Sequence, residues 1–413
     1  MLFLPYQMKQ NTPSFTGYQK LAIFLLAITQ FTVILDFMVM SPLGDTLMKS
    51  LSLTPSAFGI AVSAYAFSAG LSGLLAAGFA DRFDRKKLLL FFYVGFIIGT
   101  VLCGLAHTYV QLVGARIITG LFGGVIGSIS LAIITDIFSL QQRGRVMGFV
   151  QMGFGASQVL GIPIGLYLAG IWSWEAPFWM IAGLATIVAV VILVKLEPVT
   201  AHLGVQRKDS ILKHLWKAVI KKRHRTAFTS TALLSIGGFM MMPFASAFAI
   251  NNLHVTNQQL PVLFMVSGVS SLLIMPLVGR LSDRIDKFKI FMVASLWMMF
   301  MCVVYTNLSV TPFWIVVGLN VLLMMGIMSR VIPSSALTSA VPDMEDRGAF
   351  MSVNASLQQI AGGVAATVSG LIVVQKTSVS PLENYNIVGY VLVFISLISI
   401  ALMYRVSKLV KRT

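Results

Sequence analysis

Twelve long apolar stretches restrict the folds that this chain can adopt. Each is about 20 residues or longer, the length that a helix needs to cross the ~30 Å hydrocarbon core of a bilayer. Charged residues make up only 11% of the chain, whereas soluble domains carry roughly 25%. We therefore expect an all-α membrane protein with twelve transmembrane helices. They are predicted at 20–43, 56–80, 88–107, 110–137, 146–170, 174–195, 226–252, 258–280, 290–308, 311–338, 348–374 and 385–405.

Positive charge indicates the orientation of these helices. The formal net charge of +16 also occurs in proteins that bind nucleic acid. The placement of the basic residues along the chain distinguishes such a protein from a membrane protein with a charged cytoplasmic side. If the N-terminus is cytoplasmic, 26 of the 30 Lys and Arg residues fall in cytoplasmic segments, as the positive-inside rule requires. We expect both termini in the cytoplasm, contacts with anionic inner-leaflet lipid, and no nucleic-acid partner.

A charged pentad occurs twice between apolar stretches, at 81–85 (DRFDR) and at 283–287 (DRIDK). The two copies begin 202 positions apart, and each follows a glycine at a helix end, Gly78 or Gly279. An Arg-Gly pair, first at Arg143, recurs 204 positions later. Two landmarks at nearly the same offset indicate a duplicated unit.

The duplication predicts the domain organisation. Two parallel six-helix halves enclose a central cavity, with the substrate near the bilayer midplane. The predicted parts are an N-terminal half (1–195), a cytoplasmic linker (196–225) and a C-terminal half (226–413).

The linker carries an amphipathic pattern. Apolar residues recur at helical spacing from Ile211 to Ile220, and lysines occupy the complementary surface. Such a helix is expected to lie on the inner leaflet rather than to cross the membrane. The alternative is a solvated connector with an incidental apolar stripe.

The first pentad and its flanks, 78–87 (GFADRFDRKK), resemble the signature loop between helices 2 and 3 of the major facilitator superfamily. The resemblance in topology covers essentially the whole chain. It implies the major facilitator fold and a secondary transporter that works by alternating access, not an enzyme. Asp84 stands where that family usually has Gly, so we expect the turn of this loop to be built differently.

Three further segments resemble the drug:proton antiporter and sugar-efflux branch of that superfamily. They are 35–37 (LDF) with Pro42, Arg116 followed by Gly120, and the Gly-rich stretch 153–165 of helix 5. The resemblance in helix 5 is incomplete, because the branch has adjacent Gly-Pro and Gly-Gly pairs that are interrupted here. The candidate residues of a deformable hinge in helix 5 are Gly155, Gly161, Pro163 and Gly165.

Asp36 is the only acidic residue well inside a predicted span. A carboxylate there costs roughly 2.5–3.5 kcal/mol on insertion scales, so an intramembrane acid is a functional candidate. Alternation between wet and dry surroundings would let it bind and release a proton. The alternatives are a carboxylate that caps a helix break before Pro42, or one that lies near the outer interface.

Two arginines also fall within predicted spans. Arg116 needs a carboxylate or carbonyl partner inside the bilayer, and Asp36 is one candidate. The resemblance implies a role for Arg116 in proton coupling; a fixed structural ion pair or a carbonyl-bound arginine is the alternative. Arg330 has no acid within a span of its own half. It binds an anionic substrate group, balances Asp36 across the cavity, or extends toward the inner face.

Asp136, at the inner end of helix 4, is placed to meet the first pentad. The resemblance implies that such an acid belongs to a charge network that latches the cytoplasmic side. Exposed ion pairs are worth only ~0–1 kcal/mol, so modest binding energy would open such a latch. The alternative is that these charges serve orientation alone. The candidate gate residues are Gly78, Asp81, Arg82, Asp84, Arg85, Asp136, Arg143 and Arg145.

Other classes of chemistry lack support in the sequence. No nucleotide-binding loop, metal-ligand cluster or nucleophile constellation is present, and Cys103 and Cys302 lie in spans without metal-ligand spacing. No cofactor is expected, and the proton gradient would supply the energy. We expect a multi-pass protein of the cell membrane, the inner membrane in a Gram-negative source, acting as a monomer.

The leading hypothesis is a proton-coupled antiporter that exports small amphiphilic, drug-like or sugar-like compounds. A proton symporter or facilitator for nutrient uptake is the first alternative. A non-transporting receptor or lipid-handling protein is the alternative from another class. In the leading hypothesis, the N-terminal half holds the proton machinery and the first pentad is the gate, while the C-terminal half contributes substrate surface.

Overall fold

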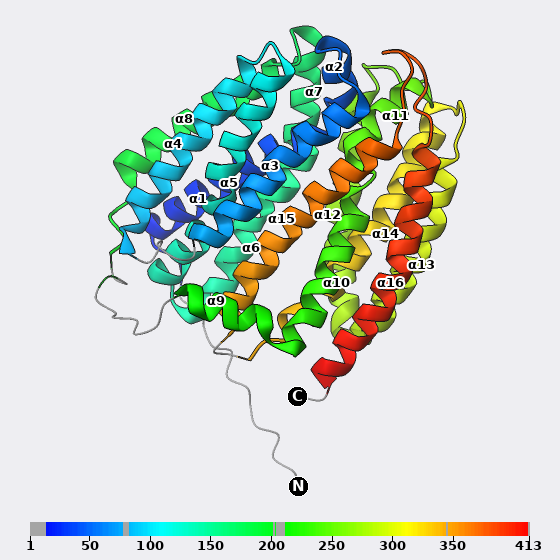
Figure 1. Ribbon diagram of the computed structural model, residues 1–413. Coiled ribbons are helices and arrows are strands. Elements are labelled where there is room, and N and C mark those ends of the chain that lie inside the picture. Colours follow the sequence, from blue (N-terminus) through cyan, green and yellow to red (C-terminus); the bar gives the residue numbers. More distant parts are fainter. Residues whose placement is uncertain (1–13, 77–81, 201–202, 204–210, 344–345, 412–413) are drawn as a thin grey trace.

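The computed structural model describes residues 14–76, 82–200, 203, 211–343 and 346–411. Within these residues the chain is helical apart from turns, loops and one isolated β-bridge between Val374 and Glu383. Twelve of the described helical segments are long and apolar enough to cross a membrane, and Figure 1 shows them as one bundle. The expectation of an all-α chain with twelve transmembrane helices is confirmed.

The spans begin and end within a few residues of their predicted limits. The first six are α1 (Gly17–Val39), α3 (Pro55–Ala76), α4 (Arg85–Gly104), α5 (Tyr109–Ile137), the consecutive elements α6 (Leu140–Ala156), η2 (Ser157–Gly161) and α7 (Ile162–Ile171), and α8 (Ala176–Lys195). The last six are α10 (Lys222–Phe239) with η4 (Met242–Phe244) and α11 (Ala245–Asn251), α12 (Leu260–Arg284), α13 (Lys287–Thr306), α14 (Phe313–Ser339), α15 (Arg347–Ile372) and α16 (Tyr385–Lys411).

Two short helices identify the ends of the bundle. Helix α9 (Ile211–Ile220) lies at one end, and helix α2 (Gly44–Ser50) lies near α11 at the other (Figure 1). We call these the linker end and the α2 end. The distribution of basic residues predicts that the linker end lies in the cytoplasm.

Three spans end or are interrupted beside a proline. Helix α1 ends at Val39, and a turn through Pro42 leads into α2, so the first span is shorter at this end than the predicted stretch 20–43. The fifth span contains the π-helical turn η2 just before Pro163. Proline has no N–H to bond the preceding turn, and a single π turn accommodates that defect. The seventh span passes through the 3₁₀ turn η4 at Pro243.

Small residues allow close contact between spans that are far apart in the sequence. Helices α3 and α15 lie side by side (Figure 1). A Cβ atom added to Gly59 of α3 would lie 2.6 Å from the carbonyl oxygen of Ala366 in α15. At a second contact, a Cβ atom on Gly268 of α12 would lie 2.9 Å from the carbonyl oxygen of Gln158 in η2. Both seams therefore depend on the absence of a side chain.

Helix α9 has two apolar faces. Leu215 and Ala218 are buried where α9 packs against α10 and α15, whereas Trp216 and Ile220 are exposed. Lys221, just after the helix, forms an ion pair with Asp346. The helix is thus attached to the C-terminal spans at the linker end, and its position on the inner leaflet stays a prediction.

The seam between α3 and α15 leads to a test. Gly59→Ala places a methyl group against the Ala366 carbonyl, and we expect overpacking to lower stability by roughly 1–3 kcal/mol. Gly114→Ala is the matched control, because Gly114 lies in α5 with no atom within 4 Å of an added Cβ. The measurement is the midpoint of thermal unfolding in detergent. Equal midpoints for the two variants would contradict the close contact.

Candidate functional site

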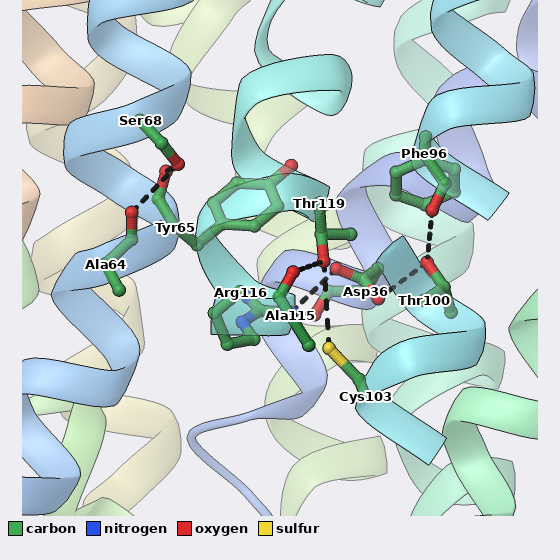
Figure 2. A network of polar contacts seen from close by, with 10 residues as sticks. All are labelled: Asp36, Ala64, Tyr65, Ser68, Phe96, Thr100, Cys103, Ala115, Arg116 and Thr119. Carbon is green, nitrogen blue, oxygen red and sulfur yellow. Dashed lines mark hydrogen bonds and ion pairs between the residues drawn. The ribbon is translucent and has the colours of Figure 1, made fainter. Parts of the chain in front are cut away.

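A buried ion pair joins α1 and α5. An Nη1 proton of Arg116 is donated to Oδ2 of Asp36 over 2.7 Å, and both side chains are wholly buried. The same nitrogen lies 3.3 Å from the backbone carbonyl oxygen of Asp36. Thr100 of α4 lies 3.2 Å from Oδ1 of Asp36 and donates to that oxygen. Figure 2 shows that the three helices converge on the carboxylate.

Aromatic and small polar groups surround this pair. The Arg116 guanidinium lies 4.5 Å from the centroid of the Tyr65 ring, within cation–π distance. Cys103 lies 3.7 Å from the Thr119 hydroxyl at the edge of the network (Figure 2). Two guanidinium nitrogens of Arg116, Nε and Nη2, have no hydrogen-bond partner among the described residues. The site is a single ion pair whose two side chains are fully enclosed by the protein.

The surroundings of Asp36 exclude one alternative for its position, that of a helix cap. Its carboxylate contacts Arg116 and Thr100 inside the bundle, so it does not cap the helix break before Pro42. The candidate partner named for Arg116 is the residue that it contacts. Thr100 was not singled out from the sequence. Its only signal there is that it is one of the few polar residues in the third apolar stretch.

A chain of aromatic contacts runs from the ion pair to the opposite half. The Tyr65 ring lies 5.2 Å from the ring of Phe37, the neighbour of Asp36 in α1. Phe37 in turn lies 6.0 Å from Phe239 at the end of α10. Phe37 and Phe239 also line a cavity of about 10 Å³ between the two halves. Two ring contacts therefore connect the surroundings of the ion pair with the seam between the halves.

Polar side chains join the two halves at the α2 end. The buried carboxylate of Asp45 in α2 accepts a hydrogen bond from the Asn251 amide of α11 over 2.5 Å. Lys49 donates to Asp45 over 2.7 Å and to the Asn251 amide oxygen over 3.4 Å. Ser246 of α11 donates to the carbonyl of Ser41 over 2.8 Å. We call Ser41, Asp45, Lys49, Ser246 and Asn251 the α2-end clasp.

At the linker end, only part of the predicted gate network comes together. Arg85 forms an ion pair with Asp136 over 3.3 Å. Arg143 donates to the carbonyls of Thr135 and Phe138, and Arg145 lies over the ring of Phe15 at 4.8 Å. Arg82 is exposed. Gly78 and Asp81 lie outside the described residues.

Asp84 and Asp286 occupy equivalent positions in the two pentads, and each caps the N-terminus of the helix that follows. Asp84 caps α4 by accepting from the Lys86 amide, and also accepts from the Val199 amide after α8. Asp286 caps α13 and pairs with Lys411 at the end of α16 over 2.7 Å. The hydrogen bond from Lys411 lowers the pKa of the Asp286 carboxyl. The turn that lacks the family's glycine is thus built around a capping carboxylate.

The predicted hinge residues of helix 5 lie in tight packing around η2. Added Cβ atoms would lie 2.2 Å from Leu272 of α12 at Gly155, and 2.6 Å from Leu35 of α1 at Gly161. Pro163 and Gly165 are buried. The segment therefore touches both the helix that carries Asp36 and the opposite half.

Arg330 lies apart from the Asp36 site. Its side chain, only 3% exposed, sits among α13, α14 and α16. Nη1 lies 3.4 Å from the Ser396 hydroxyl, and the guanidinium lies 5.6 Å from the centroid of the Phe291 ring. Burial of this kind does not fit a side chain extended to the inner face. Asp36 contacts Arg116 rather than Arg330, and an anionic partner for Arg330 stays a prediction.

Comparison with protein families identifies one match. The family model described as Major Facilitator Superfamily matches residues 26–367 and, in a second overlapping match, 227–413. Two curated relatives come from Bacillus subtilis and are described as uncharacterized MFS-type transporters. YceJ is 24% identical over 94% of this chain and 97% of its own length, and YbcL is 27% identical over 91% and 94%.

A probable sugar efflux transporter of Helicobacter pylori is 25% identical, over 45% of this chain and 48% of its own length. Among solved structures, an inward-facing, unoccupied bacterial homolog of the human lysosomal transporter Spinster superposes with a TM-score of 0.76 at 15% identity, covering 97% of this chain and 99% of its own. The xylose transporter XylE from E. coli, in a partially occluded inward-open conformation, gives 0.72 at 15%, covering 94% and 98%.

The ion pair can be tested by a double-mutant cycle. Asp36→Asn leaves the Arg116 charge buried without its counter-ion, and we expect it to lower the unfolding free energy by about 3–5 kcal/mol. Adding Arg116→Met removes that charge and should recover much of the loss. The thermal midpoints of the wild type, both single variants and the double variant give the coupling. Strictly additive effects would refute a mutual interaction.

The α2-end clasp can be tested by distance measurement. Asn251→Leu removes the amide that bonds the buried Asp45 carboxylate, an interaction worth about 1.5–3 kcal/mol. We expect spin labels at the exposed Ser50 and Gln258 to report longer distances in this variant. Asn252→Leu is the control, since Asn252 bonds Leu382 within the C-terminal half. Unchanged distances in Asn251→Leu would show that the clasp does not hold this end closed.

Proposed function

The chain belongs to the major facilitator superfamily and is a membrane transporter rather than an enzyme; within this family we propose that it is a proton-coupled antiporter. It would export small amphiphilic, drug-like or sugar-like compounds by alternating access. The observation that carries this proposal is the fully buried Asp36–Arg116 pair. It is a titratable acid inside a transmembrane bundle, where such a group marks a proton path more often than a structural contact.

Asp36 is the proton carrier in this proposal. When the site is open to the α2 end, a proton binds the carboxylate and removes its negative charge. The contact to Arg116 then loses its Coulombic attraction, and the guanidinium remains against Tyr65. After the change of conformation, release of the proton toward the linker end restores the pair. One proton crosses the membrane for each such cycle of Asp36.

Coupling requires that the proton and the substrate favour different conformations, because a ligand with equal affinity for both shifts nothing. The aromatic contacts from Tyr65 through Phe37 to Phe239 support such a link. Loss of the ion pair would release α1 from the guanidinium, which stays against Tyr65, and would so let Phe37 of α1 shift relative to Tyr65 at the seam. Substrate bound between the halves would favour the paired arrangement.

The direction of transport and the remaining assignments belong to the same proposal. The likeness to probable sugar efflux transporters, over less than half of the chain, favours export. The exposed Trp216 and Ile220 of α9 support contact with inner-leaflet lipid, and thus the division into two halves with an interfacial linker. The protein would act as a monomer in the cell membrane, with the Arg85–Asp136 pair as part of the cytoplasmic gate.

Reconstitution in liposomes tests the mechanism. With an imposed pH gradient and a pH dye inside, we expect candidate substrates to drive proton movement opposite to their own. Asp36→Asn should abolish this movement, because the amide cannot carry a proton. Asp343→Asn is the matched control, since Asp343 is exposed and lies outside the spans.

Two outcomes would count against the proposal. Proton movement that persists unchanged in Asp36→Asn would remove Asp36 from the mechanism. Substrate counterflow with no response to the pH gradient would identify a facilitator instead.

A further inference from the structure

The second buried arginine differs from the first in having no counter-ion. Arg116 is neutralised by Asp36 over 2.7 Å, whereas Arg330 has no ion pair among the described residues. A guanidinium cannot lose its charge by deprotonation in a protein. An uncompensated buried charge costs several kcal/mol, and water satisfies donors but does not cancel the charge. The surroundings of Arg330 therefore favour an anionic occupant.

The unpartnered atoms of Arg330 indicate which anion fits. Nη1 is directed to the Ser396 hydroxyl, while Nε and Nη2 have no hydrogen-bond partner. Nε and Nη2 are the two nitrogens on one side of the guanidinium, and they present parallel N–H bonds. This fork matches the two oxygens of a carboxylate, which it binds through two hydrogen bonds. A spherical ion such as chloride uses that geometry less fully.

A further donor lies on the neighbouring helix. Helices α13 and α14 run antiparallel and meet closely at Gly326, where an added Cβ would lie 2.9 Å from Cα of Met298. One turn from this contact toward the linker end are Arg330 on α14 and Ser295 on α13. The two residues thus share one level of the helix pair. Ser295 is wholly buried, and its hydroxyl also has no hydrogen-bond partner.

We propose that Arg330, with Ser295 and Ser396, forms a carboxylate-binding site in the C-terminal half. The Nε and Nη2 fork holds the two oxygens, and the Ser295 hydroxyl donates to one of them. The carboxylate is that of a transported compound or of a small free acid. The first source rests on the proposed function, since it makes an anionic, sugar-like or amphiphilic acid the substrate class.

Binding can be measured without transport. Purified protein in detergent is titrated with sodium acetate, with acetamide as the uncharged isostere and sodium chloride as the inorganic anion, at constant ionic strength. We expect acetate alone to raise the thermal midpoint saturably, by roughly 2 °C or more. Arg330→Lys keeps the charge but loses the fork, and Ser295→Ala keeps the arginine. The first should abolish the acetate effect and the second should weaken it.

Controls separate this site from others. Arg405→Lys, an exposed position near the end of α16, should respond to acetate as the wild type does. An acetate effect that survives in Arg330→Lys would place the anion elsewhere, for instance on the free nitrogens of Arg116, and would overturn the proposal. An equal effect of chloride would overturn the carboxylate assignment, and so would the absence of any acetate effect in the wild type.

Transport then distinguishes the two sources of the carboxylate. In liposomes, gluconate and its neutral counterpart glucose are compared as drivers of proton movement. A response to gluconate alone that is lost in Arg330→Lys identifies the substrate as the source. Acetate binding without any gluconate response supports the site with a small free acid as its occupant. Failure of proton coupling together with intact acetate binding refutes the antiport proposal and leaves this site standing.

Discussion

The low dielectric of the bilayer interior makes every buried charge depend on a partner, and the Asp36–Arg116 pair meets that requirement within the first six helices. Two opposite charges at 2.7 Å hold α1 and α5 at one point, and Thr100 adds α4. Each charge alone would be costly there. The contacts among these three helices therefore include a charge that a proton would remove. Few other contacts in the described chain combine complete burial with a group that titrates.

Two kinds of contact hold the two halves of the bundle together. At the α2 end, Asp45, Lys49 and Asn251 link α2 to α11 directly across the seam, so this end is closed by polar contacts that few atoms maintain. At the same end, Gly59 near the start of α3 packs against backbone atoms of α15. The glycine contacts depend on the absence of a side chain, whereas the clasp depends on a few hydrogen bonds and one ion pair.

Sequence patterns predict the spans well because twenty consecutive apolar residues have one stable solution in a bilayer. The pairing of Asp36 with Arg116 could also be predicted, because few ionisable residues lie inside the spans. The α2-end clasp could not be predicted, because Asp45 and Asn251 are 206 positions apart and each is a polar residue close to a loop, where such residues are common. The end of the first span at Val39 depends on how the turn at Pro42 packs, which the spacing of apolar residues does not indicate. The two apolar faces of α9 are likewise distinguishable only once α10 and α15 are in place.

The repeated pentad shows where the two halves are alike and where they differ. Its fourth residue, Asp84 or Asp286, caps the following helix with nearly identical backbone angles and ties that helix to the end of the last span in its half. This shared role is structural, so the duplication by itself does not make one copy a gate. The difference lies within the described spans, where the first half contains a buried acid and arginine in contact and the second contains the buried Arg330 with no ion pair. A proton can change the charge balance of the first half, while only an anion can neutralise the second.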